Sequence, residues 1–162
     1  MKLREGTEAD IAFIMATERL PGYELMIGQW DAQTHAAEMA RPGSIYLIAE
    51  ENGASVAFAH LQKLDDPNGN IYLNRFAVTQ QGAGVGTRAL ALLQDWVFAQ
   101  PHAYRLHLHF SEENKRGRRL YARAGFQDER VERQVYQLPG GRRIDTFRVS
   151  ILRPEWEKLR GM

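Results

Sequence analysis

The sequence contains no cysteine among its 162 residues. Disulfide bonds, thiolate metal sites and a cysteine nucleophile are therefore excluded. Long apolar runs are also missing: the block from Ile11 to Ala16 is typical, and it is far shorter than a membrane-spanning helix. The charged start of the chain is not followed by the apolar stretch of a signal peptide. We therefore expect a cytoplasmic protein that does not insert into a membrane.

An excess of charge of one sign is lacking as well. Twenty-one Lys and Arg side chains stand against 20 Asp and Glu, which leaves +1 at neutral pH. Nucleic-acid binding favours a basic surface interleaved with aromatic residues. We expect no nucleic-acid partner, although residues 115–123 are rich in arginine. No internal repeat and no linker divides the chain, so we expect one domain over residues 1–162.

Hydrophobic periodicity predicts alternating helices and strands. A capping box at 7–10 precedes one helix, Pro21-Gly22 ends it, and a second helix is expected over 31–41. Strands are predicted over 44–50, 55–64, 71–78 and 104–110, and two more helices over 85–100 and 115–124. A last hairpin is expected around Pro139-Gly140-Gly141, followed by a short tail. The order β-α-α-β-β-β-α-β-α-β-β is typical of a mixed α/β protein.

Glycine is concentrated in the segment 80–87, which follows a strand and opens a helix. Gly82, Gly84 and Gly86 leave room for backbone N–H groups around an anion, and the helix start adds unpaired donors. This pattern suits a phosphate or pyrophosphate. The segment lacks the Lys-Ser/Thr of a P-loop and the glycine spacing of a dinucleotide fold. A glycine-rich turn without a ligand is the alternative interpretation.

A second informative segment runs from Asn114 to Phe126. Leu120-Tyr121 lies in its middle and Gly125 near its end. Alone, the segment predicts an amphipathic helix that begins at an asparagine cap and ends at a left-handed glycine. Together with the glycine loop it forms the order strand, loop, helix, strand, helix.

These two segments resemble the signatures of the GCN5-related N-acetyltransferases. The family's Arg/Gln-x-x-Gly-x-Gly/Ala is matched by Gln81, Gly84 and Gly86, and its later Asn, Leu-Tyr and Gly-Phe by Asn114, Leu120, Tyr121, Gly125 and Phe126. The resemblance covers the element order of nearly the whole chain. It implies an α/β (α+β) fold with a single mixed, mostly antiparallel sheet and helices on both faces. A central parallel pair, strands 71–78 and 104–110, would splay apart.

The resemblance implies acetyl-CoA as co-substrate, bound where the two strands splay. Its pyrophosphate would contact the backbone from Gln81 to Thr87, and its pantetheine arm would pair with the strand near Phe76 to Val78 like an added strand. One amide of that strand would polarise the thioester carbonyl. The implied cofactor-binding residues are Phe76, Ala77, Val78, Gln81, Gly82, Ala83, Gly84, Val85, Gly86, Thr87 and Asn114. Cations near the cofactor phosphates would come from Arg88, Lys115, Arg116, Arg118, Arg119 and Arg123, for which a solvated helix face is the alternative.

Tyr121 matches the family's general acid, which protonates the departing CoA thiolate. The glutamate that many members carry as general base is missing: Tyr72 stands at its position, and tyrosine does not deprotonate an ammonium at neutral pH. We expect His109 to be the base, with His107, Glu112 or a bound water as alternatives. The pair His107-x-His109 has metal-ligand spacing, but no third ligand is evident and no metal site is expected.

The implied reaction is direct transfer of the acetyl group to a primary amine of a small molecule or a protein N-terminus, in a complex of both substrates. The acceptor pocket should come from the N-terminal helices, the loop Leu20–Trp30 and the last hairpin, with Tyr23, Glu24 and Trp30 as eligible side chains. A non-catalytic acyl-CoA sensor is the alternative function, because the strand glutamate is missing. The C-terminal strands and Trp156 are candidates for a homodimer interface.

Overall fold

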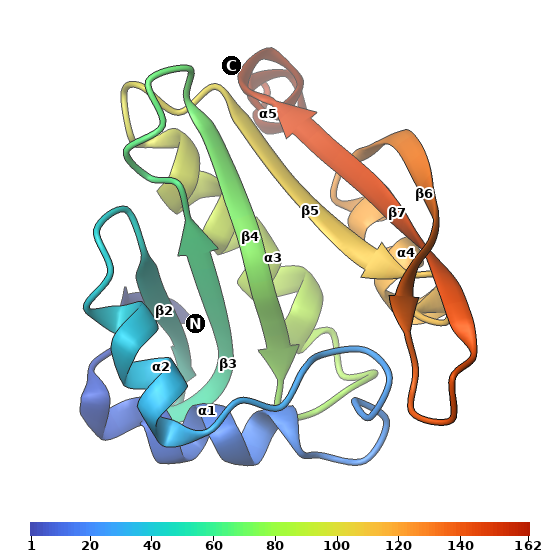
Figure 1. Cartoon of the computed structure of the whole chain (residues 1–162). Coiled ribbons are helices and arrows are strands. Elements are labelled where there is room, and N and C mark those ends of the chain that lie inside the picture. The colour runs from blue at the N-terminus through green and yellow to red at the C-terminus, as the bar shows by residue number, and fades with distance from the viewer.

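The computed structural model describes all 162 residues and shows one twisted sheet with helices on both faces (Figure 1). The strands are β1 (Lys2–Glu5), β2 (Ile45–Glu51), β3 (Ala54–Gln62), β4 (Asn70–Val78), β5 (Arg105–Ser111), β6 (Gln127–Gln137) and β7 (Arg143–Leu152). The helices are α1 (Ile11–Glu18), α2 (Ala32–Met39), α3 (Val85–Phe98), α4 (Lys115–Arg123) and α5 (Arg153–Arg160), with a 3₁₀ turn (Glu8–Asp10) before α1.

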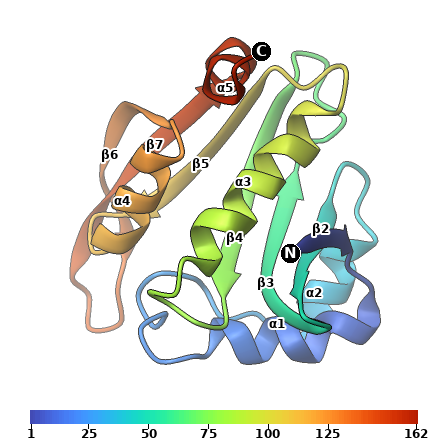
Figure 2. The same cartoon turned by 180° about the vertical axis from the view of Figure 1, so that it is seen from behind.

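The sheet has seven strands in the order β1-β2-β3-β4-β5-β7-β6. Every neighbouring pair is antiparallel except β4 and β5, which are parallel. Helices α1 and α2 lie on the front face in Figure 1, and α3 and α4 lie on the opposite face (Figure 2). The expected fold, a mostly antiparallel sheet around one parallel pair, is confirmed.

Side-chain caps and a glycine begin and end the helices near the site, and those at Asn114 and Gly125 were expected from the sequence. Asp31 begins α2 by accepting a hydrogen bond from the Thr34 N–H at 2.8 Å. Asn114 begins α4 by accepting one from the Gly117 N–H at 2.7 Å. Gly125 follows α4 with a φ of 88°, a left-handed conformation that glycine adopts at little cost.

The end of the chain forms a helix, α5, so the prediction of a short tail was wrong. The Leu152 N–H donates to the Glu155 carboxylate at 2.8 Å, which makes a helix cap without a Ser, Thr, Asn or Asp residue. Pro154 lies in the first turn, where a missing N–H costs nothing, and Gly161 ends the helix at a φ of 71°. These signals are weaker than a Ser or Asp cap and were overlooked in so short a segment.

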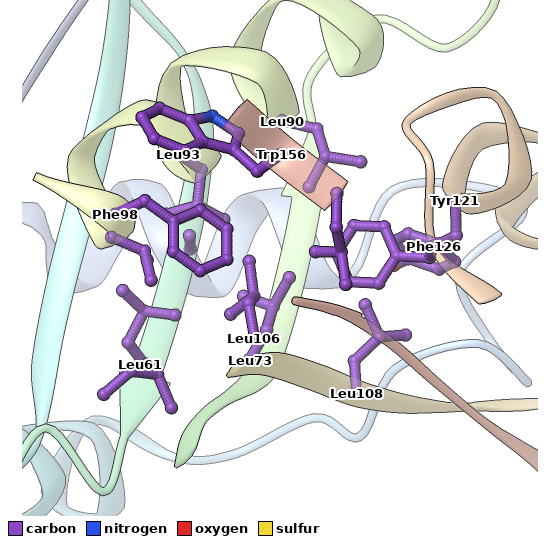
Figure 3. Close-up of a cluster of buried hydrophobic side chains, with 14 of the residues drawn as sticks. Leu61, Leu73, Leu90, Leu93, Phe98, Leu106, Leu108, Tyr121, Phe126 and Trp156 are labelled. Carbon is purple, nitrogen blue, oxygen red and sulfur yellow. The ribbon is translucent and has the colours of Figure 1, made fainter. Parts of the chain in front are cut away.

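Trp156, on α5, belongs to the core and not to an outer surface. Its ring lies 5.2 Å from that of Phe98, and its indole N–H donates to Asp95 at 2.9 Å. It sits at one end of the largest apolar cluster, with Tyr121 and Phe126 at the other end (Figure 3). Because Trp156 is only 9% exposed, it cannot supply the dimer interface suggested by the sequence.

Two apolar layers attach the helices to the sheet. The larger cluster has 18 buried residues and joins α3, α4 and α5 to the central strands. The smaller cluster lies on the other face, where α1 contributes Ile14. Ile14 packs there with four strand residues, Tyr46, Ile48, Phe58 and Ala77. Burial on both faces makes the central strands rigid supports for any site at their ends.

Strands β4 and β5 pair only where they begin. Their ladder joins residues 70–72 to residues 105–107 and then stops, and the two strands diverge (Figure 1). A β-bulge lies at the point of divergence, because Leu61 pairs with Leu73 whereas His60 pairs with Arg75, which leaves Asn74 as an extra residue. Beyond the bulge, the edge of β4 that faces β5 has no strand partner.

Gly69 holds the start of β4 against the start of β5 and gives a testable prediction. Its φ is 70°, and a Cβ there would lie 2.2 Å from the His102 carbonyl oxygen. The Gly69 carbonyl also accepts hydrogen bonds from the Tyr104 and Arg105 N–H groups. We expect Gly69→Ala to lower the free energy of unfolding by about 3 kcal/mol or more, since backbone strain and a backbone clash add.

Gly53→Ala is the matched control. Gly53 also has a left-handed φ, 80°, but nothing lies within 4 Å of the added Cβ. This variant should therefore show the conformational cost alone, about 1–2 kcal/mol. Urea unfolding at equilibrium compares the two variants with the wild type. Equal losses for both would show that the contact with His102 does not matter.

Candidate active site

A cleft of about 630 Å³ opens where β4 and β5 diverge. Three segments line it: the loop between α1 and α2, the end of β4 with the glycine loop, and helix α4 with the residues before it. The start of α3 and helix α4, which contribute to this lining, lie on the face of the sheet shown in Figure 2. The volume is within the range of small-molecule and cofactor sites.

The glycine loop directs the start of α3 toward this cleft. Gly82 and Gly84 have φ values of 86° and 73°, and Gly84 is the N-cap of α3. These left-handed conformations turn the chain so that N–H groups at the helix start remain available to a ligand. Any residue with a side chain would strain the backbone at these φ values, which explains why both positions are glycine.

Eight of the 11 cofactor-binding residues expected from the sequence line the cleft: Phe76, Val78, Gln81, Gly82, Gly84, Gly86, Thr87 and Asn114. Three do not. Ala77 points to the opposite face of the sheet, into the cluster with Ile14. Val85 is buried against strands β2, β3 and β4, and Ala83 is exposed outside the cleft. Six residues that were not among the expected cofactor-binding residues also line the cleft: Gly22, Met26, Gln80, Glu113, Gly117 and Leu120.

Four cations of the basic stretch line the cleft: Lys115, Arg116, Arg119 and Arg123. The other two candidate cations do not line the cleft and form ion pairs with other residues. Arg118 pairs with Asp128 at 3.2 Å, and Arg88 pairs with Glu51 at 2.9 Å. The cleft's one acidic side chain, Glu113, is paired with Arg142 at 2.7 Å. The α4 wall is therefore positive and suits phosphate groups.

Tyr121 reaches the cleft from the buried side of α4. It is 7% exposed and packs between Phe110 and Phe126, with ring centroids 5.5 and 5.7 Å away. Figure 3 shows Tyr121 beside Phe126. Burial raises the pKa of Tyr121 well above that of an ordinary tyrosine, so its hydroxyl keeps its proton at neutral pH. No group of the protein forms a hydrogen bond with this hydroxyl.

A smaller pocket of about 50 Å³ leads from the cleft between the diverging strands. It shares Tyr23, Met26, Phe76, Asn114 and Tyr121 with the cleft and adds His109 and Arg75. Tyr121 comes from the helix on one face of the sheet, whereas Arg75 faces α1 on the other. This small pocket between the diverging β4 and β5, which we call the inner pocket, is thus lined by residues from both faces of the sheet.

His109 is the one candidate base side chain that lines the inner pocket with Tyr121. The Arg148 Nε–H donates to His109 Nε2 at 2.9 Å, which leaves the ring proton on Nδ1, 3.0 Å from Glu132. Burial, and then the charge of Arg148, lowers the pKa of His109. The imidazole is therefore neutral at pH 7 and in the protonation state of a base.

His107 and Glu112, the alternative bases, line neither pocket. His107 stacks on Tyr72 with centroids 5.1 Å apart, and burial lowers its pKa to about 4. Glu112 accepts a hydrogen bond from the Asp145 N–H at 3.0 Å near the last hairpin. No group of three or more His, Asp or Glu side chains is arranged to hold a metal ion.

A buried ion pair supports the loop beside the inner pocket. Arg75 donates to Glu18 and to the Gly28 carbonyl, and its guanidinium carbon lies 3.5 Å from the centroid of the Trp30 ring. Glu18 is fully buried and Arg75 is 6% exposed. Burial lowers the pKa of Arg75, and the charge of Glu18 opposes that effect. This pair was not foreseen from the sequence.

The three side chains expected in the acceptor pocket have different places. Tyr23 lines both the cleft and the inner pocket, and its hydroxyl is bonded to Val78. Trp30 packs against Arg75 and lines neither. Glu24 accepts a hydrogen bond from the Gly22 N–H at 2.8 Å and also lies outside both.

The fold and the cleft define the class of an acyl-CoA-dependent transferase: a parallel strand pair that opens over a glycine loop, with a buried tyrosine at the opening. The family comparison agrees. Residues 13–126 match the model of the acetyltransferase (GNAT) family. The chain belongs to this family, and the resemblance identified from the sequence is confirmed. It is an acyltransferase that uses acetyl-CoA as co-substrate for N-acetylation, as the sequence predicted.

Solved structures with the same fold include acetyltransferases for very different amines. A spermidine N-acetyltransferase from Vibrio cholerae, in complex with CoA and spermine, is 16% identical, with a TM-score of 0.81 and 96% of each chain covered. An aminoglycoside acetyltransferase with coenzyme A and kanamycin is 19% identical, with a TM-score of 0.79 and 98% of each chain covered. The ribosomal-protein-S18-alanine N-acetyltransferase from Escherichia coli is 21% identical, with a TM-score of 0.76 and coverage of 93% of this chain and 92% of that one. At these identities the likeness shows the fold alone. No helix of the chain is long and apolar enough to cross a membrane.

Proposed function

We propose that acetyl-CoA binds in the cleft, with its pyrophosphate at the N–H groups of residues 81–87 and its pantetheine arm along residues 76–78. The start of α3 and the four cations from α4 support the position of the phosphates. The open edge of β4 supports the position of the arm, because an extended amide chain can pair there as an added strand.

In this arrangement Tyr121 is the general acid and His109 the general base. Tyr121 holds a proton at the neck between cleft and inner pocket, where the thiolate of CoA would leave. His109 would take the proton of the attacking amine at Nε2 once the Arg148 side chain releases that nitrogen. Glu132, next to Nδ1, would then stabilise the imidazolium.

The acceptor is a single primary amine, that of a small molecule or a protein N-terminus, and not a polycation. The observation that carries this proposal is the lining of the inner pocket, in which Arg75 is the one charged residue besides the titratable His109. The carboxylates just behind the lining, Glu18 and Glu132, already pair with Arg75 and with Arg148, Arg130 and His109. A second ammonium of a polyamine would therefore be desolvated beside a guanidinium, which costs free energy.

Two measurements test the proposed function. Saturating acetyl-CoA, at about a hundredfold over its dissociation constant, should stabilise the protein by roughly 2.7 kcal/mol and raise the melting temperature by about 5–10 °C. Thiol release is then followed with a peptide carrying an N-terminal alanine, a small monoamine, spermidine and kanamycin. We expect kcat/KM for a monoamine or the peptide to exceed that for either polycation by at least about tenfold.

The outcomes separate the alternatives. A polycation as the best acceptor would contradict the proposed pocket chemistry. Binding of acetyl-CoA without thiol release from any amine would favour the non-catalytic sensor. No thermal shift at millimolar acetyl-CoA would contradict the proposed cofactor site itself.

Three further expectations stay predictions: that residues 1–162 act as one N-acetyltransferase domain, that the protein is cytoplasmic, and that it forms a homodimer. Limited proteolysis, cell fractionation and sedimentation equilibrium test them in turn. The outer edge of β6 is free in the monomer, with Val131, Val135 and Tyr136 each about half exposed, and is the surface to examine in a dimer.

A further inference from the structure

One side chain of the loop between α1 and α2 contacts the open edge of β4. The Tyr23 hydroxyl accepts a hydrogen bond from the Val78 N–H at 2.9 Å and donates one to the Val78 carbonyl at 3.1 Å. Two bonds to the N–H and carbonyl of one residue are the pattern that an adjacent antiparallel strand makes. Tyr23 thus takes the place of a strand at the last residue of β4.

The edge that Tyr23 occupies is the one left open by the divergence of β5. The Thr79 N–H donates to the Val56 carbonyl on β3 at 2.8 Å, so Thr79 faces that neighbour. Successive residues of a strand direct their polar groups to opposite edges, and Val78 therefore faces away from β3. Phe76, two residues earlier, has the same orientation. These are the residues along which we propose that the pantetheine arm lies.

Tyr23 also restricts the inner pocket. Tyr23 and Met26 line the cleft and the inner pocket alike. At about 50 Å³, the inner pocket has room for a few water molecules and not for an amine with its attached chain. In this position the loop is compatible with neither the proposed path of the cofactor arm nor an acceptor amine in the inner pocket.

The tip of the loop can move without disrupting the fold. Its far end is anchored, because Gly28 accepts a hydrogen bond from Arg75 and the Trp30 N–H lies 3.4 Å from Glu18. Residues 20–26, in contrast, form backbone hydrogen bonds only within the loop or to the end of α1. Apart from packing, the Tyr23 hydroxyl is what bonds this tip to the sheet.

We infer that Tyr23 competes with acetyl-CoA for the N–H and carbonyl of Val78, and that the cofactor displaces it and so opens the inner pocket. This inference rests on the proposed function. The free protein then consists mainly of the closed form, and its apparent affinity for acetyl-CoA is reduced by the fraction of molecules in which Tyr23 is released.

The variant Tyr23→Phe tests the competition directly. It removes one oxygen and keeps the ring, so the loop packing is preserved while both bonds to Val78 are lost. Calorimetric titration should show acetyl-CoA binding about 5- to 30-fold tighter than in the wild type, as expected for two ordinary hydrogen bonds. Adenosine 3′,5′-bisphosphate, which lacks the pantetheine arm, should bind both proteins equally, within about twofold.

The comparison distinguishes competition from damage, because a disturbed fold weakens binding and does not tighten it. Tyr104→Phe is the control: Tyr104 is 50% exposed, lines neither pocket, and should leave both affinities unchanged. Unchanged or weaker acetyl-CoA binding by Tyr23→Phe would overturn the inference and leave the proposed function intact. Failure of the wild type itself to bind acetyl-CoA would instead overturn the proposed function.

Discussion

Replacing Tyr121 by phenylalanine should lower kcat by about 10²- to 10⁴-fold, the range for loss of a general acid, while acetyl-CoA binds as before. The ring is packed between Phe110 and Phe126, and this packing is independent of the hydroxyl. The hydroxyl forms no hydrogen bond with the protein, so its removal leaves no group unpaired. Transfer would then require water or the amine itself to protonate the leaving thiolate.

Steady-state kinetics and titration calorimetry with acetyl-CoA measure the two effects separately. Tyr136→Phe is the control, since Tyr136 is 51% exposed on β6 and lines neither pocket. The companion variant His109→Gln should also lower kcat and should remove the acidic limb of the pH–rate profile, which reports the base. A kcat within threefold of the wild type in Tyr121→Phe would eliminate Tyr121 as the acid.

The second large effect concerns stability. Glu18→Gln should lower the free energy of unfolding by about 3–5 kcal/mol, because it leaves the Arg75 guanidinium buried without a counter-charge. Glu18 is fully buried, and besides Arg75 it contacts His35 at 3.3 Å and the Trp30 N–H at 3.4 Å. The amide keeps the shape of the carboxylate, so the loss reports charge and hydrogen bonding more than packing.

Glu51→Gln is the matched control, because the Glu51–Arg88 pair is exposed and has a similar separation, 2.9 Å. Exposed pairs contribute about 0–1 kcal/mol. Urea unfolding of both variants measures whether the Glu18–Arg75 pair contributes as a buried ion pair or only as much as an exposed one. The double variant Glu18→Gln/Arg75→Met should recover part of the loss, since it removes the unpaired charge. A loss below about 1 kcal/mol in Glu18→Gln would mean that water reaches Arg75 and replaces its partner.

Local patterns predicted most of the fold. The alternation of Leu106, Leu108 and Phe110 with His107 and His109 indicated β5, and those three apolar residues lie in the main core cluster. The cap at Asn114 was correctly identified because a side chain and an N–H three residues later suffice to make it. The final helix, α5, was not predicted, because none of the common N-cap residues begins it and its cap is formed by the Glu155 carboxylate instead.

The candidate site was predicted in part. Residues of the glycine loop, Asn114 and Tyr121 were identified because they lie within two short segments of recognisable spacing. The bulge at Asn74 was not, since it appears only when β4 is paired with β3. The neutral state of His109 likewise depends on Arg148 and Glu132 from two other strands.

The sequence by itself determined the order of elements as far as β7, the glycine loop and the helix that carries Tyr121. Those features arise from periodicity, caps and backbone freedom within a few neighbouring residues. The tertiary structure alone decided that Arg75 pairs with Glu18, 57 positions away, and that the Tyr23 hydroxyl forms hydrogen bonds with Val78, 55 positions away. Such contacts depend on how the sheet stacks the helices and where its strands diverge, and no local pattern in the sequence encodes them.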